Sequence, residues 1–152
     1  MADAAYNDAL LRAVPQQRPF RFVDEIVEVS DDHIVGRYRF RDDEFFYAGH
    51  FPGNPVTPGV VLIETLAQIG VVALGLHLAS GVEGVDRDTL TTVFTESNVE
   101  FTGVVKPGDE VTVRASKMYF RRMKLKVEAE MRLADGTPVC AGELAGMGVN
   151  LQ

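Results

Sequence analysis

Hydrophobic and polar residues alternate with a period of two along several stretches of the chain, a pattern that predicts β-strands. The clearest stretch is Lys124 to Leu133, where every second residue is apolar and all of the others are charged. One face of this strand is therefore expected to meet solvent. Asp135-Gly136 provides a turn into a second such stretch, Val139 to Val149, so the two are expected to form a hairpin.

Four further stretches are rich in β-branched and aromatic residues, the composition that favours strands. A short Asp31-Asp32 turn joins the first two into an expected hairpin, and Lys106 to Asp109 turns the chain into the last. Connections between the strands after residue 90 are all short enough for antiparallel pairing. The four stretches are Phe22 to Val29, Ile34 to Phe40, Thr91 to Phe101 and Val111 to Phe120.

Residues 60–79 are apolar all round and about as long as a membrane span, roughly 20 residues. Glu64, Gln68 and His77 interrupt the run and no basic flank anchors it, so we expect a buried helix and no membrane insertion. Gly70 and Gly75 weaken a helix by about 1 kcal/mol each, which indicates close packing against the turns that hold them.

The elements therefore follow the order of short helix, two strands, long apolar helix and about four strands. This predicts an α+β fold in which an antiparallel sheet packs on one helix. The 152 residues fit a single domain, 1–152, in which residues 1–13 form a short N-terminal helix or arm without the features of a signal peptide. A sheet covers only part of a helix that is apolar on every side, so a partner subunit is expected.

Composition narrows the function classes. Apolar residues make up 46% of the chain and charged residues 24%, as in ordinary soluble proteins, and a net charge of −7 gives no support for nucleic-acid binding. The single Cys140 excludes an internal disulfide framework, fits a reducing compartment such as the cytoplasm, and is interpreted as a buried structural thiol. No cluster of residues indicates a metal site.

Candidate chemistry lies in the segment Gly49 to Gly59, where three prolines and three glycines among eleven residues impose a fixed irregular loop. The loop carries His50, and Pro58 stands where the long helix can begin. Glu64 has apolar neighbours on every side, so its carboxyl group must be paired, protonated or directed into a cavity. A loop histidine can simply hydrogen-bond a backbone carbonyl. Together the two residues suggest an acid/base pair around a buried cavity.

The run GHFPGNPVTPGVVLIETLAQ resembles the signature of the (3R)-hydroxyacyl-acyl-carrier-protein dehydratases of the FabZ type, which have the hot-dog fold. The resemblance covers roughly residues 14 to 148. It also rests on Arg18-Pro19-Phe20 with Val23-Asp24, on Phe101, on Val105 to Asp109 and on Cys140 to Glu143. It implies an antiparallel sheet wrapped around one long central helix, and dimers that join two sheets edge to edge.

The chemistry that this resemblance implies is loss of water from a (3R)-3-hydroxyacyl thioester to give the trans-2-enoyl thioester. His50 would take the proton alpha to the thioester, Glu64 would protonate the leaving hydroxyl, and the Gly59 N–H would receive charge on the thioester oxygen. No metal or cofactor is implied beyond the phosphopantetheine of the acyl carrier protein that holds the substrate. The implied substrate-binding residues are Phe51, Pro58, Val60 and Gln68; the last either orients the acid or satisfies a buried polar group.

The acyl chain is expected in an apolar tunnel between helix and sheet, with its mouth near basic side chains because carrier proteins are acidic. The candidate carrier-protein contacts are Lys117, Arg121, Arg122 and Lys124; alternatively, this run is a solvated strand. The parity of Arg121 with Met123 and Leu125 indicates a bulge or a position at the tunnel rim. The expected assembly is a homodimer with His50 from one chain and Glu64 from the other, with a trimer of dimers as a larger form.

Departures from the family pattern leave chain length and pathway open among fatty acid, polyketide and aryl-polyene synthesis. Gln17 to Phe20 stands where the family has His-Arg-Tyr-Pro-Phe, and Thr57 replaces a customary methionine. Asn98 to Phe101 stands where the family has a basic residue or cysteine before Arg-Phe. Glutamate at position 64 favours a simple dehydratase over one that also isomerises the double bond. Two other classes stay open, a hot-dog thioesterase, which would release free thiol, and a non-catalytic acyl-thioester-binding protein, which would form no enoyl product.

Overall fold

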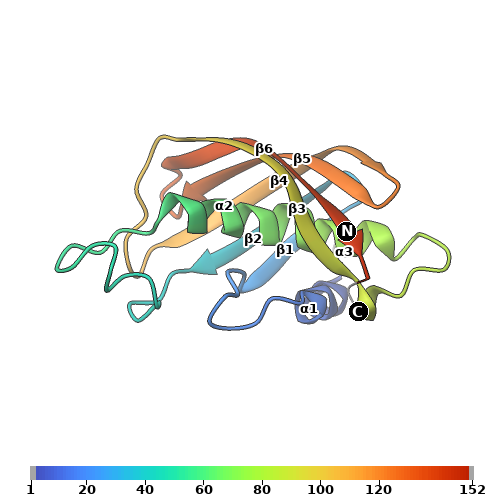
Figure 1. Ribbon diagram of the computed structural model, residues 1–152, viewed down its shortest axis with the longest axis horizontal. Coiled ribbons are helices and arrows are strands. Elements are labelled where there is room, and N and C mark those ends of the chain that lie inside the picture. The colour runs from blue at the N-terminus through green and yellow to red at the C-terminus, as the bar shows by residue number, and fades with distance from the viewer. Residues whose placement is uncertain (1–2, 151–152) are drawn as a thin grey trace.

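The computed structural model describes residues 3–150, in which one antiparallel sheet wraps around a long helix (Figure 1). The sheet order is β1-β2-β4-β5-β6-β3, and every neighbouring pair is antiparallel. This is the expected α+β hot-dog architecture. The strands are β1 (Glu25–Val29), β2 (His33–Arg39), β3 (Thr91–Phe101), β4 (Glu110–Arg121), β5 (Lys124–Leu133) and β6 (Pro138–Val149).

The long helix runs from Gly59 to Ala79 in three consecutive segments: α2 (Gly59–Ala67), a π-helical turn η1 (Gln68–Ala73) and α3 (Leu74–Ala79). It is long and apolar enough to cross a membrane, but 72% of its most apolar window is buried inside the fold. The interpretation as a buried core helix is therefore confirmed.

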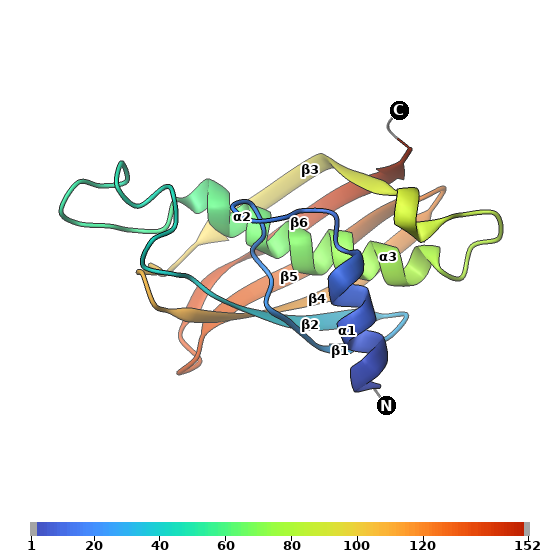
Figure 2. The ribbon, with the colours of Figure 1, turned by 90° about the horizontal axis from the view of Figure 1, so that it is seen from below.

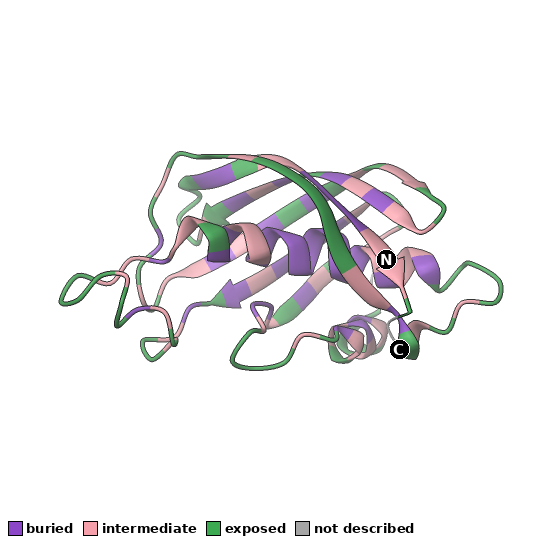
Figure 3. Cartoon of the chain, viewed as in Figure 1, coloured by how far each residue is buried: buried purple, intermediate pink, exposed green. Residues whose placement is uncertain are grey.

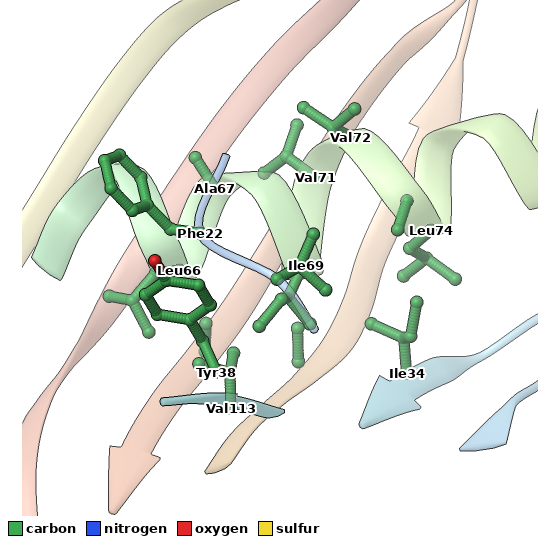
Figure 4. Packing of buried hydrophobic residues seen from close by; sticks show 14 of the residues in the cluster. Phe22, Ile34, Tyr38, Leu66, Ala67, Ile69, Val71, Val72, Leu74 and Val113 are labelled. Carbon is green, nitrogen blue, oxygen red and sulfur yellow. The ribbon is translucent and has the colours of Figure 1, made fainter. Parts of the chain in front are cut away.

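The core lies between this helix and the concave face of the sheet. Leu66, Ile69 and Leu74 are wholly buried and face Ile34 and Tyr38 of β2 and Val113 of β4 (Figure 4). A Cβ added at Gly70 would stand 2.9 Å from the Ala115 Cβ atom, so glycine is required for this close approach. At Gly75 the nearest atom would be at an ordinary 3.8 Å, so close packing is confirmed for the first glycine only.

The strand expected from Phe22 begins only at Glu25. Residues 14–24 form instead an irregular segment, here called the strap, which crosses the helix between α1 (Ala4–Ala13) and β1 (Figure 2). The Phe22 N–H donates to the Gln68 side-chain oxygen at 2.6 Å rather than to a neighbouring strand. The backbone at Phe22 therefore bonds a helix side chain and not a neighbouring strand. The β-propensity of the sequence does not reveal this difference.

The last hairpin, β5 with β6, forms as expected, with Lys124 opposite Met147 and Met131 opposite Cys140. The short connection from β3 to β4 does not form a hairpin. β3 pairs with β6 over its whole length, while β4 pairs with β2 and β5. After the turn at Lys106 to Asp109 the chain is held on β2 by hydrogen bonds between Phe40 and the Gly108-Asp109 backbone.

β3 is an edge strand of the described sheet and is exposed along most of its eleven residues (Figure 3). Three apolar side chains on it, Val93, Phe94 and Phe101, are 38%, 45% and 45% exposed. A long, exposed, partly apolar edge strand is a surface on which another chain can pair.

The N-terminal helix expected within residues 1–13 is present as α1, with the Asp3 side chain accepting from the Ala5 N–H at its start. Residues 1 and 2 lie outside the described part of the chain. Leu10 is wholly buried, and the Tyr6 hydroxyl bonds His77 Nδ1 at 2.6 Å. The helix therefore covers the C-terminal end of the long helix.

Candidate active site

The loop that carries His50 is fixed by its own backbone. The Val56 N–H donates to the His50 carbonyl at 2.9 Å, and Phe51 and Asn54 bond each other in both directions. At its end the loop is pinned to the body, because the Thr57 N–H donates to the Val105 carbonyl at 2.9 Å and the Thr57 and Tyr47 hydroxyls are 2.6 Å apart. The proline- and glycine-rich sequence thus forms the rigid loop that was expected.

His50 lies half-buried on this loop with its Nδ1 atom 2.8 Å from the Val56 carbonyl oxygen. A carbonyl only accepts, so Nδ1 carries a proton and donates it, and in the neutral ring Nε2 is left with its lone pair. The imidazole stacks on Phe51 with 4.1 Å between ring centroids. The backbone bond weighed as the simple alternative is thus present, and it also fixes the tautomer that a base requires.

Glu64 lies in the second turn of α2, half-buried among apolar residues. Burial raises the pKa of its carboxyl group, and the hydrogen bond from Gln68 opposes that rise to a smaller extent. The carboxyl group is therefore both paired and shifted toward its protonated form, as a general acid requires.

Gln68 connects Glu64 to the strap. Its Nε2 group donates to Glu64 Oε2 and to the Phe20 carbonyl, both at 2.9 Å, and its Oε1 accepts from the Phe22 N–H. The side chain is wholly buried. The amide therefore bonds both the Glu64 carboxyl group and backbone groups of the strap, an arrangement compatible with either reading made from the sequence, and its role stays a prediction.

Glu64 opens into a cavity of ≈ 100 Å³ between the strap, the helix and strands β3 and β6. Gln16 of the strap and Phe94 of β3 form parts of its wall, and the other lining residues are Ala67, Val71, Val72, Thr92 and Gly146. A second, narrower cavity of ≈ 10 Å³ shares Val71, Thr92 and Gly146 with the first and ends at Phe120, Met123 and Leu125. Together the two outline an apolar path from Glu64 along the helix.

The remaining residues from the motif stand where the loop enters the helix. Pro58 precedes the first helical residue, Gly59, and its carbonyl accepts from the N–H groups of Val61 and Leu62. A Cβ atom at Gly59 would stand 3.2 Å from the Phe101 ring, so a side chain there would crowd that ring unless the ring shifted. Phe51 and Val60 are 52% and 74% exposed and line neither cavity.

The described chain does not by itself bring His50 to Glu64. No hydrogen bond or ion pair of residues 3–150 joins the two side chains, and His50 is absent from the wall of the cavity that Glu64 lines. The loop projects from the end of the molecule at which the long helix begins (Figure 1). One copy of the chain therefore holds the expected base and acid without assembling them.

The basic residues expected at a tunnel mouth lie around the β4–β5 turn, at the end of the molecule opposite the His50 loop (Figures 1 and 2). Lys117 stands 3.9 Å from Asp32, and Arg121 lies over the Tyr119 ring at 4.5 Å. Arg122 occupies the turn itself with a φ of 52°, and Lys124 begins β5. The irregularity inferred from the parity of Arg121 is present as a bulge between Lys117 and Tyr119.

Reasoning from the sequence missed Gln16, Thr92 and Phe94, which share the cavity with Glu64. Thr92 and Phe94 share one parity of β3, so alternation could have placed them together on its inner face. Gln16 lies in the irregular strap, where no periodicity tells which way a side chain points.

Cys140 is buried without a disulfide partner, and burial raises the pKa of its thiol to about 12. Such a thiol stays protonated and unreactive. The structural role expected from the sequence fits this setting.

Comparison with known proteins relates this chain to FabA-like and FabZ proteins. A family model described as "FabA-like domain" matches residues 14–145. A protein of Caldicellulosiruptor bescii named "3-hydroxyacyl-[acyl-carrier-protein] dehydratase FabZ" is 35% identical over 146 residues, covering 91% of this chain and 96% of that protein. A protein of the same name from Syntrophobacter fumaroxidans is 36% identical over 117 residues, covering 77% and 76% of the two chains.

Among solved structures, the dehydratase heterocomplex ApeI:P of Xenorhabdus doucetiae aligns with a TM-score of 0.76 at 17% identity, covering 93% of this chain and 91% of that chain. A hypothetical thioesterase from Streptococcus pneumoniae, solved with coenzyme A, aligns with a TM-score of 0.59 at 16% identity, covering 84% and 87%. At such identities these likenesses show the shared hot-dog fold only.

Proposed function

The chain belongs to the FabA-like family, and from that premise we propose that it removes water from (3R)-3-hydroxyacyl thioesters carried on acyl carrier protein, giving trans-2-enoyl thioesters. The observation that carries the proposal is Glu64, a carboxyl group that burial shifts toward its protonated form at the wall of an apolar cavity. A leaving hydroxide needs such an acid.

In this reaction the Nε2 atom of His50 removes the proton alpha to the thioester. The bond from Nδ1 to the Val56 carbonyl supports this role, because it keeps Nε2 unprotonated in the neutral ring. The electron pair released from the C–H bond forms the new carbon–carbon double bond. The proton taken by His50 is later returned to Glu64, which restores both groups for the next turnover.

Glu64 gives its proton to the 3-hydroxyl oxygen as the carbon–oxygen bond breaks, and water leaves. Gln68 holds Glu64 Oε2, so Oε1 is the oxygen free to deliver the proton. The thioester oxygen becomes more negative as the alpha proton departs. We assign its stabilisation to the Gly59 N–H, because the first N–H groups of a helix have no acceptor within the helix.

The acyl chain is proposed to follow the apolar path from Glu64 past Val71 toward Met123. The thioester then lies at the Glu64 end of that path, where the loop that brings His50 also brings Phe51, Pro58 and Val60 from the same copy as His50. Lys117, Arg121, Arg122 and Lys124 stand near the Met123 end of their own copy's path, so we propose that they contact the acidic carrier protein from the subunit that does not hold the acyl chain. Their positive charge suits an acidic carrier protein.

The functional unit is proposed to be a homodimer in which the His50 loop of each copy reaches Glu64 of the partner subunit. Hot-dog proteins are dimeric, and two observations support a shared site here. The described chain leaves His50 outside the cavity of its own Glu64, and β3 offers a long exposed edge for pairing. A trimer of such dimers and a cytoplasmic location, the latter supported by the lone buried Cys140, complete the proposal.

The direct test is to incubate the purified protein with 3-hydroxyoctanoyl acyl carrier protein and follow both enoyl absorbance and free thiol. A dehydratase forms the enoyl thioester without releasing thiol. Release of thiol instead would mean thioester hydrolysis, and binding without either signal would mean a non-catalytic acyl-binding protein. Either result would overturn the proposal.

The roles of the two catalytic residues are tested by His50→Ala and Glu64→Gln. Each change removes one proton transfer, so each is expected to lower turnover by about 10²- to 10⁴-fold. The two losses are not expected to multiply in the double variant, since the groups act on one transition state. A single variant that kept near-native turnover, with unchanged thermal unfolding, would show that its residue has been given the wrong role.

A further inference from the structure

Gln16 lines the cavity beside Glu64, and its side chain holds a buried polar atom without a partner. Its Oε1 atom makes no hydrogen bond, although it is shielded from solvent. Buried acceptors in folded proteins are nearly always paired. The amide shares the cavity of ≈ 100 Å³ with Glu64, and most of the remaining wall is apolar. An unused acceptor beside the acid therefore points to a ligand that carries a donor.

The other amide near Glu64 is not available to a ligand. The Gln68 side chain already hydrogen-bonds the Glu64 carboxyl group, the Phe20 carbonyl and the Phe22 N–H. Gln16 is held on the same strap, between Val14, which is buried in the core, and Phe20 and Phe22, whose backbone groups bond Gln68. The strap is thus tied at both sides of Gln16, and the amide is presented to the cavity from a fixed backbone.

We infer that Gln16 positions the substrate, its Oε1 atom accepting a hydrogen bond from the 3-hydroxyl group while Glu64 protonates the oxygen of that same group. This inference rests on the proposed function and names a residue that the function as stated does not use. A hydroxyl group has one donor hydrogen and two acceptor lone pairs. Glu64 donates its proton to one lone pair of the hydroxyl oxygen. The hydrogen of the hydroxyl group still needs an acceptor, because the cavity is otherwise mostly apolar.

The step balances without proton transfer to Gln16. The carbon–oxygen bond breaks with its electron pair on oxygen, Glu64 supplies one hydrogen, and the hydroxyl's own hydrogen stays and completes the water molecule. As the oxygen accepts the proton from Glu64 it becomes electron-poor, so the hydrogen bond to Gln16 strengthens toward the transition state. Gln16 then both selects the orientation of the hydroxyl and lowers the barrier.

The test compares Gln16→Met and Gln16→Leu, which remove the acceptor, with Gln17→Met as the matched control on the neighbouring exposed glutamine. We expect kcat/KM for 3-hydroxyoctanoyl pantetheine to fall about tenfold in both Gln16 variants, the loss of one hydrogen bond. Affinity for octanoyl pantetheine, which has no hydroxyl group, is expected to stay within about twofold of wild type, because the bond concerns the hydroxyl alone. The Gln17→Met control is expected to match wild type in both assays.

If Gln16 had a merely structural role, its replacement would lower affinity for octanoyl pantetheine as much as it lowers kcat/KM for 3-hydroxyoctanoyl pantetheine. That result would overturn the inference. Unchanged turnover in the Gln16 variants of an active enzyme would also overturn it, while the proposed function would stand. A wild-type protein that forms no enoyl product would overturn the proposed function, and the inference would fall with it.

Discussion

At the scale of single residues, burial and Gln68 act in opposite directions on the pKa of Glu64. A hydrogen bond donated to a carboxyl oxygen favours the ionised form, whereas burial favours the neutral form. Burial is the larger effect at Glu64, so its pKa is raised in spite of Gln68. Activity is therefore expected to fall at high pH, when Glu64 ionises and can no longer act as the acid.

Gln68→Met removes the hydrogen bond and keeps the side-chain volume. With the opposing effect gone, the pKa of Glu64 rises further, and the basic limb of the pH–rate profile is expected to move to higher pH. The profile of kcat/KM between pH 5 and 10 measures this. Glu64→Gln is the control, and its residual activity should lack that limb. A basic limb left in place by Gln68→Met would mean that another group supplies the acid.

His50 and Glu64 were predicted from the sequence because proline and glycine fix the loop and because an isolated carboxyl group in an apolar run is conspicuous, whereas Gly59 was implied by the family resemblance. The role of each of the three stays a proposal. The tautomer of His50 could not be read, since it depends on the Val56 carbonyl that only the folded loop brings within 2.8 Å. Gln16 was missed for a similar reason. The direction of a side chain in an irregular segment follows from tertiary contacts alone.

At the scale of elements, the loop is anchored by the buried pair of hydroxyls on Tyr47 and Thr57, which are 5% and 3% exposed. Removing one hydroxyl leaves the other buried without a partner, whereas removing both leaves none unpaired.

Tyr47→Phe and Thr57→Val are each expected to lower the free energy of unfolding by about 1–3 kcal/mol, and the double variant is expected to lose less than the sum. Urea unfolding of the four proteins measures the coupling, and turnover should follow the same order because the pair holds the His50 loop. Strictly additive losses would show that the two hydroxyls do not act as a pair.

The path between helix and sheet ends at Met123, which with Phe120 closes the narrow second cavity. Met123→Ala lengthens that path, so preference should shift toward longer acyl chains, by about tenfold for two more methylene groups. Ratios of kcat/KM for 3-hydroxyacyl substrates of increasing length measure it. Met118→Ala is the control, because Met118 is 47% exposed and lines neither cavity. An equal shift of the chain-length preference in both variants would show that the acyl chain does not end at Met123.

Local pattern predicted the elements better than their partners. The β5–β6 hairpin followed from alternation and one turn, because both signals lie within neighbouring residues. The pairing of β3 with β6 joins residues about fifty positions apart, and nothing local distinguishes it from pairing with β4. The π-helical turn at Gln68–Ala73 also has no signal in the apolar run that holds it.

At the scale of the whole molecule, a partner subunit was expected from a helix that is apolar on all sides, and the dimer stays a proposal because this chain alone already buries most of that helix. Two features of the structure support the proposal. β3 leaves an exposed edge with Val93, Phe94 and Phe101, and the His50 loop stands away from the cavity of Glu64. A second copy related by a two-fold axis would cover the first and supply the missing base, and each copy would do the same for the other.

The measurement that tests the shared site most directly is the activity of mixed dimers made by co-expressing His50→Ala and Glu64→Gln chains with different affinity tags. In a mixed dimer one site carries both lesions and the other carries none. With random pairing about half of all dimers are mixed, and each mixed dimer has one intact site of two. The whole co-expressed population is therefore expected to recover about a quarter of native dehydratase activity, although both parents are inactive. If each site came from one chain, every site would carry a lesion. Tagged mixed dimers without activity would contradict the account.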